Sequence, residues 1–282
     1  WLFNKLKNVK SENAKKEFYL TDLVDIAIHE NSKVLAFESN PSEDFIGINT
    51  RVDFADVSSV MKVRINKSHM LNGVGILDYL HTTIDADVKV GEDTTIMPYS
   101  FLLGTTSIGK NCVIENGVVL KNVTVGDGVH IRAHSIVEES VIEDSAVVGP
   151  FARIRPSSKV GKGAKVGNFV ELKKCEMKDG AKASHLSYLG DAVIGAKANI
   201  GCGTITCNYD GFAKYQTIIG DEVFVGSDVQ FIAPVEIGRG SIIGAGSTIT
   251  KNVPADALAL SRAEQTTIDG GAIRFREKMK KK

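Results

Sequence analysis

The residues best suited to chemistry lie in one stretch, Ser184–Lys214, where polar side chains gather within an otherwise regular sequence. Histidine titrates near neutral pH, so His185 is the natural candidate for a general base. A lone histidine in a repeat is more often a surface residue than a catalytic one. The neighbouring Tyr188, Asn199 and Lys214 favour the catalytic interpretation, because residues one coil apart in a repetitive fold stack in space.

The overall composition excludes few classes of protein, but it indicates which partners are not favoured. Hydrophobic residues make up 43% of the 282 residues, which is enough for a buried core. Lys+Arg and Asp+Glu both count 34, so the net charge favours neither nucleic acid nor an anionic membrane as a partner. The sequence has no apolar run of about 18 residues. The four cysteines form no CxxC pair, which indicates a reduced, cytoplasmic compartment. A start at Trp1 rather than Met suggests a fragment or a processed product.

The elements that must position these residues follow from a six-residue period. Aliphatic residues recur every six positions from Ile84 to Ile249, often followed by glycine. This period predicts a parallel β-helix in which three six-residue segments make one coil, although the period alone does not fix its hand. This series of aliphatic residues, the six-residue ladder, shifts by one residue at a few places. Small adjustments at the corners of the coil would absorb these slips. It breaks once, at Cys207–Lys214, where Asn-Tyr-Asp-Gly predicts a projecting loop.

The sequence before and after the repeat has a different character. Residues 1–80 predict a small α/β arrangement, the end of a larger domain: a helix capped by Thr21, a short strand at Val34–Phe37 and a second helix reaching about His69. Residues 81–250 form the predicted β-helix domain. Residues 251–282 predict an irregular tail with a short basic helix and a solvated end at Lys280–Lys282.

Several long motifs resemble one bacterial family: VGPFARIRPSSKVGKGAKVGNFVELKK (Val148–Lys174), the Ser184–Lys214 stretch, TIIGDEVFVGSD (Thr217–Asp228) and ALSRA (Ala259–Ala263). They are similar to the bifunctional N-acetylglucosamine-1-phosphate uridyltransferase/glucosamine-1-phosphate N-acetyltransferase. That resemblance implies a left-handed parallel β-helix, a homotrimer with sites between subunits, and a cytoplasmic enzyme. The implied reaction transfers acetyl from acetyl-CoA to glucosamine 1-phosphate, for the synthesis of UDP-N-acetylglucosamine, a precursor of peptidoglycan and lipopolysaccharide.

The resemblance also implies a role for individual residues. It assigns the catalytic base to His185 and its orienting partner to Glu171. The implied substrate-binding residues are Arg155, Lys173, Tyr188, Asn199 and Lys214. The implied acetyl-CoA-binding residues are Cys202, Asn208, Tyr209, Ser227, Ala245 and Arg262. Cys202 stands where the family commonly has alanine, and the C-terminal tail lacks the tryptophan that family members often carry.

The part of the sequence before the repeat resembles the family more weakly, through FYLTD (Phe18–Asp22) and GINTR (Gly47–Arg51). Asn49 matches a position that binds the metal, Mg²⁺, and the nucleotide sugar in the uridyltransferase domain. The glycine-rich nucleotide loop of that domain is absent from this sequence. We therefore expect Asn49 to be idle and uridyltransferase activity to be absent from this chain.

The sequence also allows three other hypotheses. A metal-dependent hydratase on this fold would need three converging histidines, and the spacing of His81, His130, His134 and His185 does not place them on one face. A covalent acetyl-cysteine route through Cys202 or Cys207 is less favoured than direct transfer, because nothing indicates an activating base. A non-catalytic solenoid would not need the polar cluster around His185.

Overall fold

The computed structural model describes residues 1–38, 40 and 42–280. The chain divides into two compact units, Trp1–Val57 and Ser58–Lys282. Lys281 and Lys282, part of the end expected to be solvated, lie outside the described residues.

The regular elements of the first unit, among its described residues, are all helices. Its helices are α1 (Leu2–Lys5), η1 (Leu6–Asn8), α2 (Asp22–His29) and η2 (Ser42–Phe45). The helix predicted after Thr21 is confirmed as α2. The strand predicted at Val34–Phe37 is wrong: these residues form no regular element, and Phe37 is 93% exposed. A short apolar run becomes a strand only beside a partner strand, and the described residues of this unit supply none.

Helix α3 (Arg51–Leu71) crosses the division between the units and confirms the second predicted helix. A reciprocal cap starts it, because the Thr50 hydroxyl accepts the Asp53 N–H and the Asp53 carboxylate accepts the Thr50 N–H. Its last turns are attached to the β-helix by Asn66, which is fully buried. The Asn66 side-chain amide donates to the backbone oxygens of Tyr79 and Thr82, at 2.8 Å each.

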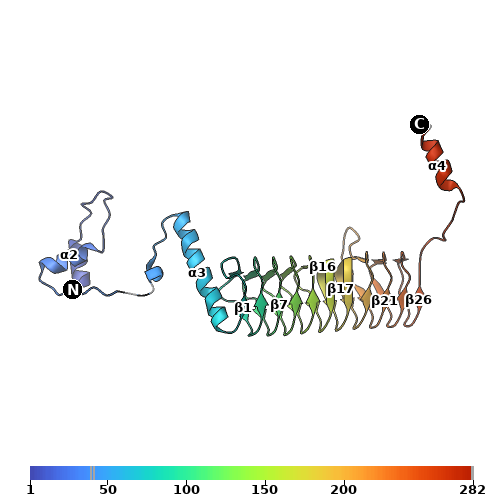
Figure 1. Ribbon diagram of the computed structural model, residues 1–282, viewed down its shortest axis with the longest axis horizontal. Coiled ribbons are helices and arrows are strands. Elements are labelled where there is room, and N and C mark those ends of the chain that lie inside the picture. Colours follow the sequence, from blue (N-terminus) through green and yellow to red (C-terminus); the bar gives the residue numbers. More distant parts are fainter. Residues whose placement is uncertain (39, 41, 281–282) are drawn as a thin grey trace. The chain divides into compact units, whose positions relative to one another are not determined.

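The predicted parallel β-helix is confirmed (Figure 1). Its strands are β1 (Gly75–Ile76), β2 (Thr83–Ile84), β3 (Lys89–Val90), β4 (Thr95–Ile96), β5 (Phe101–Leu103), β6 (Ser107–Ile108), β7 (Val113–Ile114), β8 (Val119–Lys121), β9 (Thr124–Val125), β10 (His130–Ile131), β11 (Ile136–Glu138), β12 (Val141–Ile142), β13 (Val147–Val148), β14 (Arg153–Ile154), β15 (Lys159–Val160), β16 (Lys165–Met177), β17 (Lys182–Ile194), β18 (Asn199–Ile200), β19 (Ile205–Cys207), β20 (Thr217–Ile219), β21 (Phe224–Val225), β22 (Gln230–Ile232), β23 (Val235–Ile237), β24 (Ile242–Ile243), β25 (Thr248–Ile249) and β26 (Leu258–Ala259). Most short strands pair in parallel with the third strand along the chain, as β4 does with β7, so three segments make one coil.

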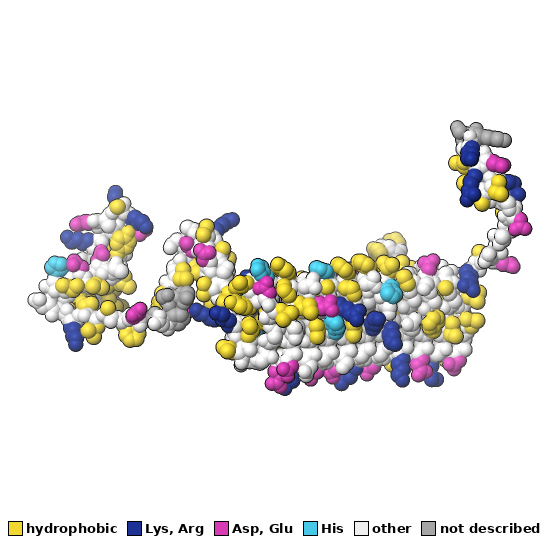
Figure 2. Space-filling view, in the orientation of Figure 1, with side chains coloured by type: hydrophobic (Ala, Val, Ile, Leu, Met, Phe, Trp, Pro, Cys, Tyr) yellow, Lys and Arg dark blue, Asp and Glu magenta, His cyan; other side chains and the backbone are white. Residues whose placement is uncertain are grey.

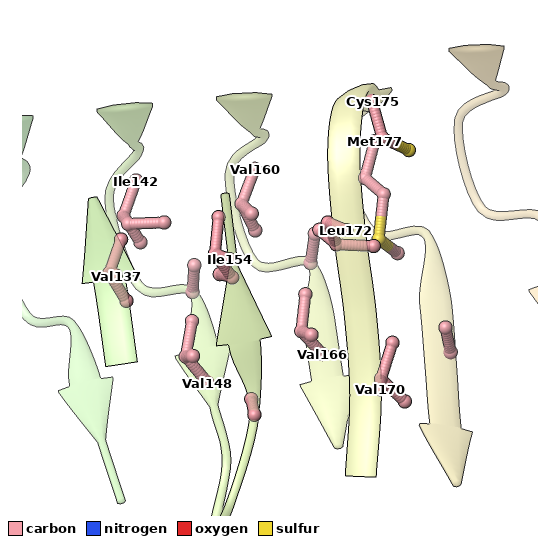
Figure 3. Packing of buried hydrophobic residues seen from close by; sticks show 14 of the residues in the cluster. Val137, Ile142, Val148, Ile154, Val160, Val166, Val170, Leu172, Cys175 and Met177 are labelled. Carbon is pink, nitrogen blue, oxygen red and sulfur yellow. The ribbon is translucent and has the colours of Figure 1, made fainter. Parts of the chain in front are cut away.

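The six-residue ladder forms the core. Val137, Ile154 and Leu172 lie one above another in successive coils and are completely buried, as Figure 3 shows. A second inward position, two residues before each ladder residue, was not predicted. Valine and smaller residues occupy it, among them Thr94 and Ser100, both fully buried. Their hydroxyls donate to backbone oxygens, which satisfies them inside the coil.

The predicted loop is a hairpin inserted into one coil. Cys175 pairs with Ala192 in the next coil, and Ala192 pairs in turn with Thr217, which is considerably farther along the chain. The additional residues turn back between Tyr209 and Lys214, which form an antiparallel bridge.

The corners absorb the slips of the ladder, as expected. Where the ladder is regular, paired residues are separated by three full six-residue segments, as Thr95 and Val113 are. Where it slips, the paired residues are one position closer along the chain, as Cys175 and Ala192 are. The strands stay in register across both kinds of coil.

One corner of the coil carries bulky residues in the left-handed backbone region. His134, Phe151 and Phe169 have φ of 58°, 53° and 55° and stack ring on ring, with centroids 5.2 and 5.5 Å apart. Leu186 follows Phe169 at the same corner, with φ of 43°. We call these four residues the corner ridge. Phe151, Phe169 and Leu186 are about half exposed. In Figure 2 hydrophobic side chains gather along the upper half of the coil, and charged ones line its lower edge.

The short helix predicted in the tail is confirmed as α4 (Gly271–Lys280). The strands span Gly75 to Ala259, a slightly longer range than the expected 81–250. Among the described residues, the search for a membrane-crossing helix finds none of sufficient length and apolarity.

Candidate active site

Five of the predicted site residues form one row along the coils. Backbone hydrogen bonds at this place connect each coil to the next. They run from Gly203 N–H to Leu186 O, from Asp228 N–H to Cys202 O and from Gly246 N–H to Ser227 O, at 2.7–2.9 Å. The row ends where the Arg262 guanidinium donates to the Ala245 carbonyl, at 3.1 Å. We call this set the corner row: His185, Cys202, Ser227, Ala245 and Arg262. It runs beside the corner that carries Leu186.

The partner of His185 in the chain is Asn168, which the sequence did not indicate. Asn168 lies opposite His185 in the neighbouring coil, and its side-chain oxygen is 2.7 Å from His185 Nδ1. Glu171, which the resemblance names as the orienting partner of His185, lies opposite Tyr188 instead. A corner at Phe169 and Leu186 separates the two pairs. The role of Glu171 in catalysis stays a prediction.

Four predicted residues gather on the side of the coil that follows this corner. Arg155 Nη1 lies 3.0 Å from Glu171 Oε1, with both side chains partly exposed. Glu171 pairs with Tyr188, and Lys173 pairs with Gly190 on the neighbouring strand. The result is a surface of two cations, a carboxylate and a phenol, which we call the polar face: Arg155, Glu171, Lys173 and Tyr188.

Asp191 is a further polar residue at this place. Its Oδ2 accepts a hydrogen bond from Asn208 Nδ2 and lies 3.9 Å from Lys173 Nζ. The side chains of Asp191 and Lys173 are only 18% and 17% exposed. The signal that could have found Asp191 is its position inside the Ser184–Lys214 stretch, directly after Gly190.

The chain does not bring all the predicted residues together. Asn199 lies on β18, on the side of the coil before the corner, in the column of Lys182 and Phe224. Tyr209 and Lys214 lie on the hairpin and are exposed. The predicted site is therefore divided between two sides of one coil and a projecting hairpin.

The cysteines differ in their availability. Cys112 and Cys175 are buried, and burial raises the pKa of each thiol. Cys207 is half-buried, and burial also raises the pKa of its thiol. A thiol with a raised pKa is a poor nucleophile near neutral pH, which weakens the acetyl-cysteine route through Cys207. Cys202 is half-buried within the corner row.

The described residues contain no group of three or more His, Cys, Asp or Glu side chains that could hold a metal ion. His130 is 2.6 Å from Glu115, and His81 is 2.7 Å from Asp78, so these histidines lie in separate pairs. Asn49 is exposed, and its backbone N–H belongs to the cap of α3 through Asp53. The described residues around Asn49 do not fit a Mg²⁺ site.

Comparison with known proteins agrees with the repeat fold. A sequence profile described as the GMPPB C-terminal domain matches residues 80–155, and one described as bacterial transferase hexapeptide (six repeats) matches residues 139–174 and 216–251. Among solved structures, the UDP-N-acetylglucosamine acyltransferase of Francisella novicida is 18% identical with a TM-score of 0.42, over 73% of this chain and 76% of that one. That likeness is too distant to inform the site.

Curated relatives are much more similar. "Bifunctional protein GlmU" of Geotalea uraniireducens is 48% identical over 269 residues, which is 95% of this chain and 59% of that protein. "Bifunctional protein GlmU" of Geotalea daltonii is 50% identical over 274 residues, which is 97% of this chain and 60% of that protein. The chain thus spans about three fifths of the length of these relatives. The resemblance carried by the motifs is confirmed: nearly all of this chain is similar in sequence to bacterial proteins named GlmU.

Proposed function

We propose that the chain is an acetyltransferase that moves the acetyl group of acetyl-CoA to the amine of glucosamine 1-phosphate. The product is N-acetylglucosamine 1-phosphate, for the synthesis of UDP-N-acetylglucosamine. The observation that carries the proposal is the corner row beside the polar face. A histidine and the predicted cofactor-binding residues share one line along the coils, and the predicted phosphate-binding cations lie around the adjacent corner.

The contact of His185 defines its chemical role. An amide oxygen accepts hydrogen bonds, so Asn168 Oδ1 holds the proton on His185 Nδ1 and leaves the lone pair on Nε2. His185 is exposed, so Nε2 can take a proton from the substrate ammonium. The free amine then attacks the thioester carbonyl carbon and the C–N bond forms. The nitrogen of the tetrahedral adduct loses a second proton as the C–S bond breaks, and the leaving thiolate takes up a proton. Coenzyme A thus leaves as a thiol, and one proton is released overall. No covalent enzyme intermediate is needed.

The polar face supplies the charges for a sugar phosphate. The Arg155 guanidinium suits a phosphate, and Lys173 adds a second positive charge. Tyr188 lies beside them on the neighbouring strand. In the proposed complex, acetyl-CoA runs along the corner row past Cys202, Ser227 and Ala245, with Asn208 and Tyr209 of the hairpin beside it. Arg262, at the end of the row, meets a phosphate group of the cofactor.

We also propose that the sites are completed in a homotrimer. Asn199 and Lys214 lie apart from the polar face, so a neighbouring subunit is needed to bring equivalents of them to it. The exposed corner ridge offers an apolar surface for such a neighbour. Phe169→Glu should therefore reduce both assembly, measured by analytical ultracentrifugation, and activity. Phe37→Glu, at another exposed phenylalanine, is the matched control; a trimer that survives Phe169→Glu contradicts the use of the ridge.

The function is tested by thiol release. The purified chain should release thiol from acetyl-CoA only when glucosamine 1-phosphate is present. His185→Ala should lower the rate by at least about a hundredfold, the usual contribution of a general base. His81→Ala, in the separate pair with Asp78, should keep the rate. If the wild-type chain releases no thiol, or if His185→Ala keeps full activity, the proposal is wrong. With UTP and Mg²⁺ added, we expect no UDP-N-acetylglucosamine from this chain.

A further inference from the structure

Asp191 contacts two residues that are proposed to bind different ligands. Its carboxylate lies between Lys173, proposed to meet the sugar phosphate, and Asn208, proposed to lie beside acetyl-CoA. Its side chain is 18% exposed, so water satisfies little of its charge. Neither contact is explained by the β-helix itself, because the core of the coil consists of the inward ladder.

The contact with Asn208 is at the base of the hairpin. Asn208 is 7% exposed, and its backbone oxygen accepts the Tyr215 N–H at 2.9 Å, which closes the loop. The hairpin beyond it carries Lys214 in an antiparallel bridge with Tyr209. The bond from Asn208 to Asp191 therefore connects the loop to the rigid coil.

The backbone that carries Asp191 is itself anchored to the next coil. Gly190 N–H donates to Thr206 Oγ1 at 2.7 Å, and Thr206 Oγ1 donates to the Gly190 oxygen at 3.0 Å. Asp191 has φ of 47°, a left-handed conformation that Asp and Asn tolerate better than most residues. Asp191→Asn therefore keeps the backbone and an amide oxygen for Asn208, and removes only the charge.

We propose that Asp191 is a positioning residue that orders Lys173 and the base of the hairpin before the sugar phosphate binds. This inference rests on the proposed function. A lysine side chain has large rotamer freedom, and a fixed counter-charge reduces the part of it that must be lost on binding. Without the charge, the Lys173 ammonium is free to turn into solvent, away from the polar face.

Steady-state kinetics test the ordering of Lys173. Asp191→Asn should raise KM for glucosamine 1-phosphate by about fivefold, the upper scale of an ion pair that forms no direct hydrogen bond, with a smaller change in KM for acetyl-CoA and in kcat. Asp191→Glu should recover part of the loss. In a Lys173→Met background, Asp191→Asn should add little, because both changes remove one interaction. Asp179→Asn is the control, since the Asp179 carboxylate accepts the Lys162 backbone N–H at a corner away from the polar face.

Proteolysis tests the hairpin without relying on activity. In Asp191→Ala, trypsin should cleave after Lys214 several times faster than in wild type, as followed by mass spectrometry. An unchanged or lower KM for the sugar phosphate in Asp191→Asn, full additivity with Lys173→Met, or unchanged cleavage in Asp191→Ala overturns the inference. An inactive wild type overturns the proposed function instead, and the cleavage rate still decides whether Asp191 holds the hairpin.

Discussion

Gly190→Ala should lower activity without lowering stability. A methyl group added at Gly190 would lie 2.4 Å from the Tyr188 hydroxyl oxygen and 2.6 Å from the adjacent ring carbon. Ordinary contacts are 3.4 Å or longer, so the tyrosine ring in Gly190→Ala must move by about 1 Å or more. The obstacle is the far end of a rotatable side chain rather than backbone. Tyr188 is therefore displaced from the polar face while the coil stays intact.

The expected effects of Gly190→Ala on stability and on substrate binding have opposite signs. Gly190 lies outside the left-handed backbone region, so alanine fits its backbone. Alanine also restricts the unfolded chain, which stabilises the fold by about 0.4–1 kcal/mol. If Tyr188 gives one hydrogen bond to the substrate, its displacement costs about 0.5–1.5 kcal/mol of binding. That cost corresponds to a fall in kcat/KM of roughly twofold to tenfold, with an unchanged or slightly higher melting temperature.

The assay compares Gly190→Ala with two other variants. Tyr188→Phe should lower kcat/KM for glucosamine 1-phosphate to a similar extent, because it removes the same hydroxyl. Gly195→Ala should instead lower the melting temperature, because its methyl group would lie 2.3 Å from the backbone of Gly220. Full activity in Gly190→Ala, or a loss of activity only in proportion to a lower melting temperature, would refute the reasoning.

Three further outcomes follow from burial and charge. Phe231→Ala removes a fully buried side chain and should lower the free energy of unfolding by about 3–5 kcal/mol in chemical denaturation. Acetyl-CoA should slow alkylation of Cys202, whereas the buried Cys175 should react only after unfolding; mass spectrometry of labelled peptides distinguishes them. The Arg153 hydrogen bond lowers the pKa of Glu138 below its ordinary 4.5, so its stabilising effect is present above that pH and is lost as the pH falls through the folded-state pKa. Glu138→Gln should therefore flatten the acid side of the melting-temperature profile.

The fold was predictable where the sequence repeats. A period of six directs one large aliphatic residue inward from each segment, and the described ladder is buried accordingly. The second inward position escaped prediction because valine, alanine and cysteine are mixed there with serine and threonine, so no single residue type marks it. Thr94 and Ser100 fit there because they are small and because backbone oxygens of the coil accept their hydroxyl protons. Val34–Phe37 shows the opposite error, since a local apolar run carries no information about a partner strand.

The sequence indicated residue types for a candidate site but not their contacts, and Asn168 shows why. Its amide lies beneath His185 because that coil is one residue shorter than three full segments, not because amide and imidazole are unusual partners. Where a coil is one residue shorter, the residues that face each other in successive coils are one position closer in the chain, although the strands stay in register. Glu171, which is closer to His185 in the chain than Asn168 is, lies past the corner and contacts Arg155 instead. Asp191 follows the same logic, because only the three-dimensional coil brings it between Lys173 and the base of the hairpin. To find which residues face each other in a solenoid, one must therefore know the length of each coil. Each one-residue slip of the ladder shortens one coil.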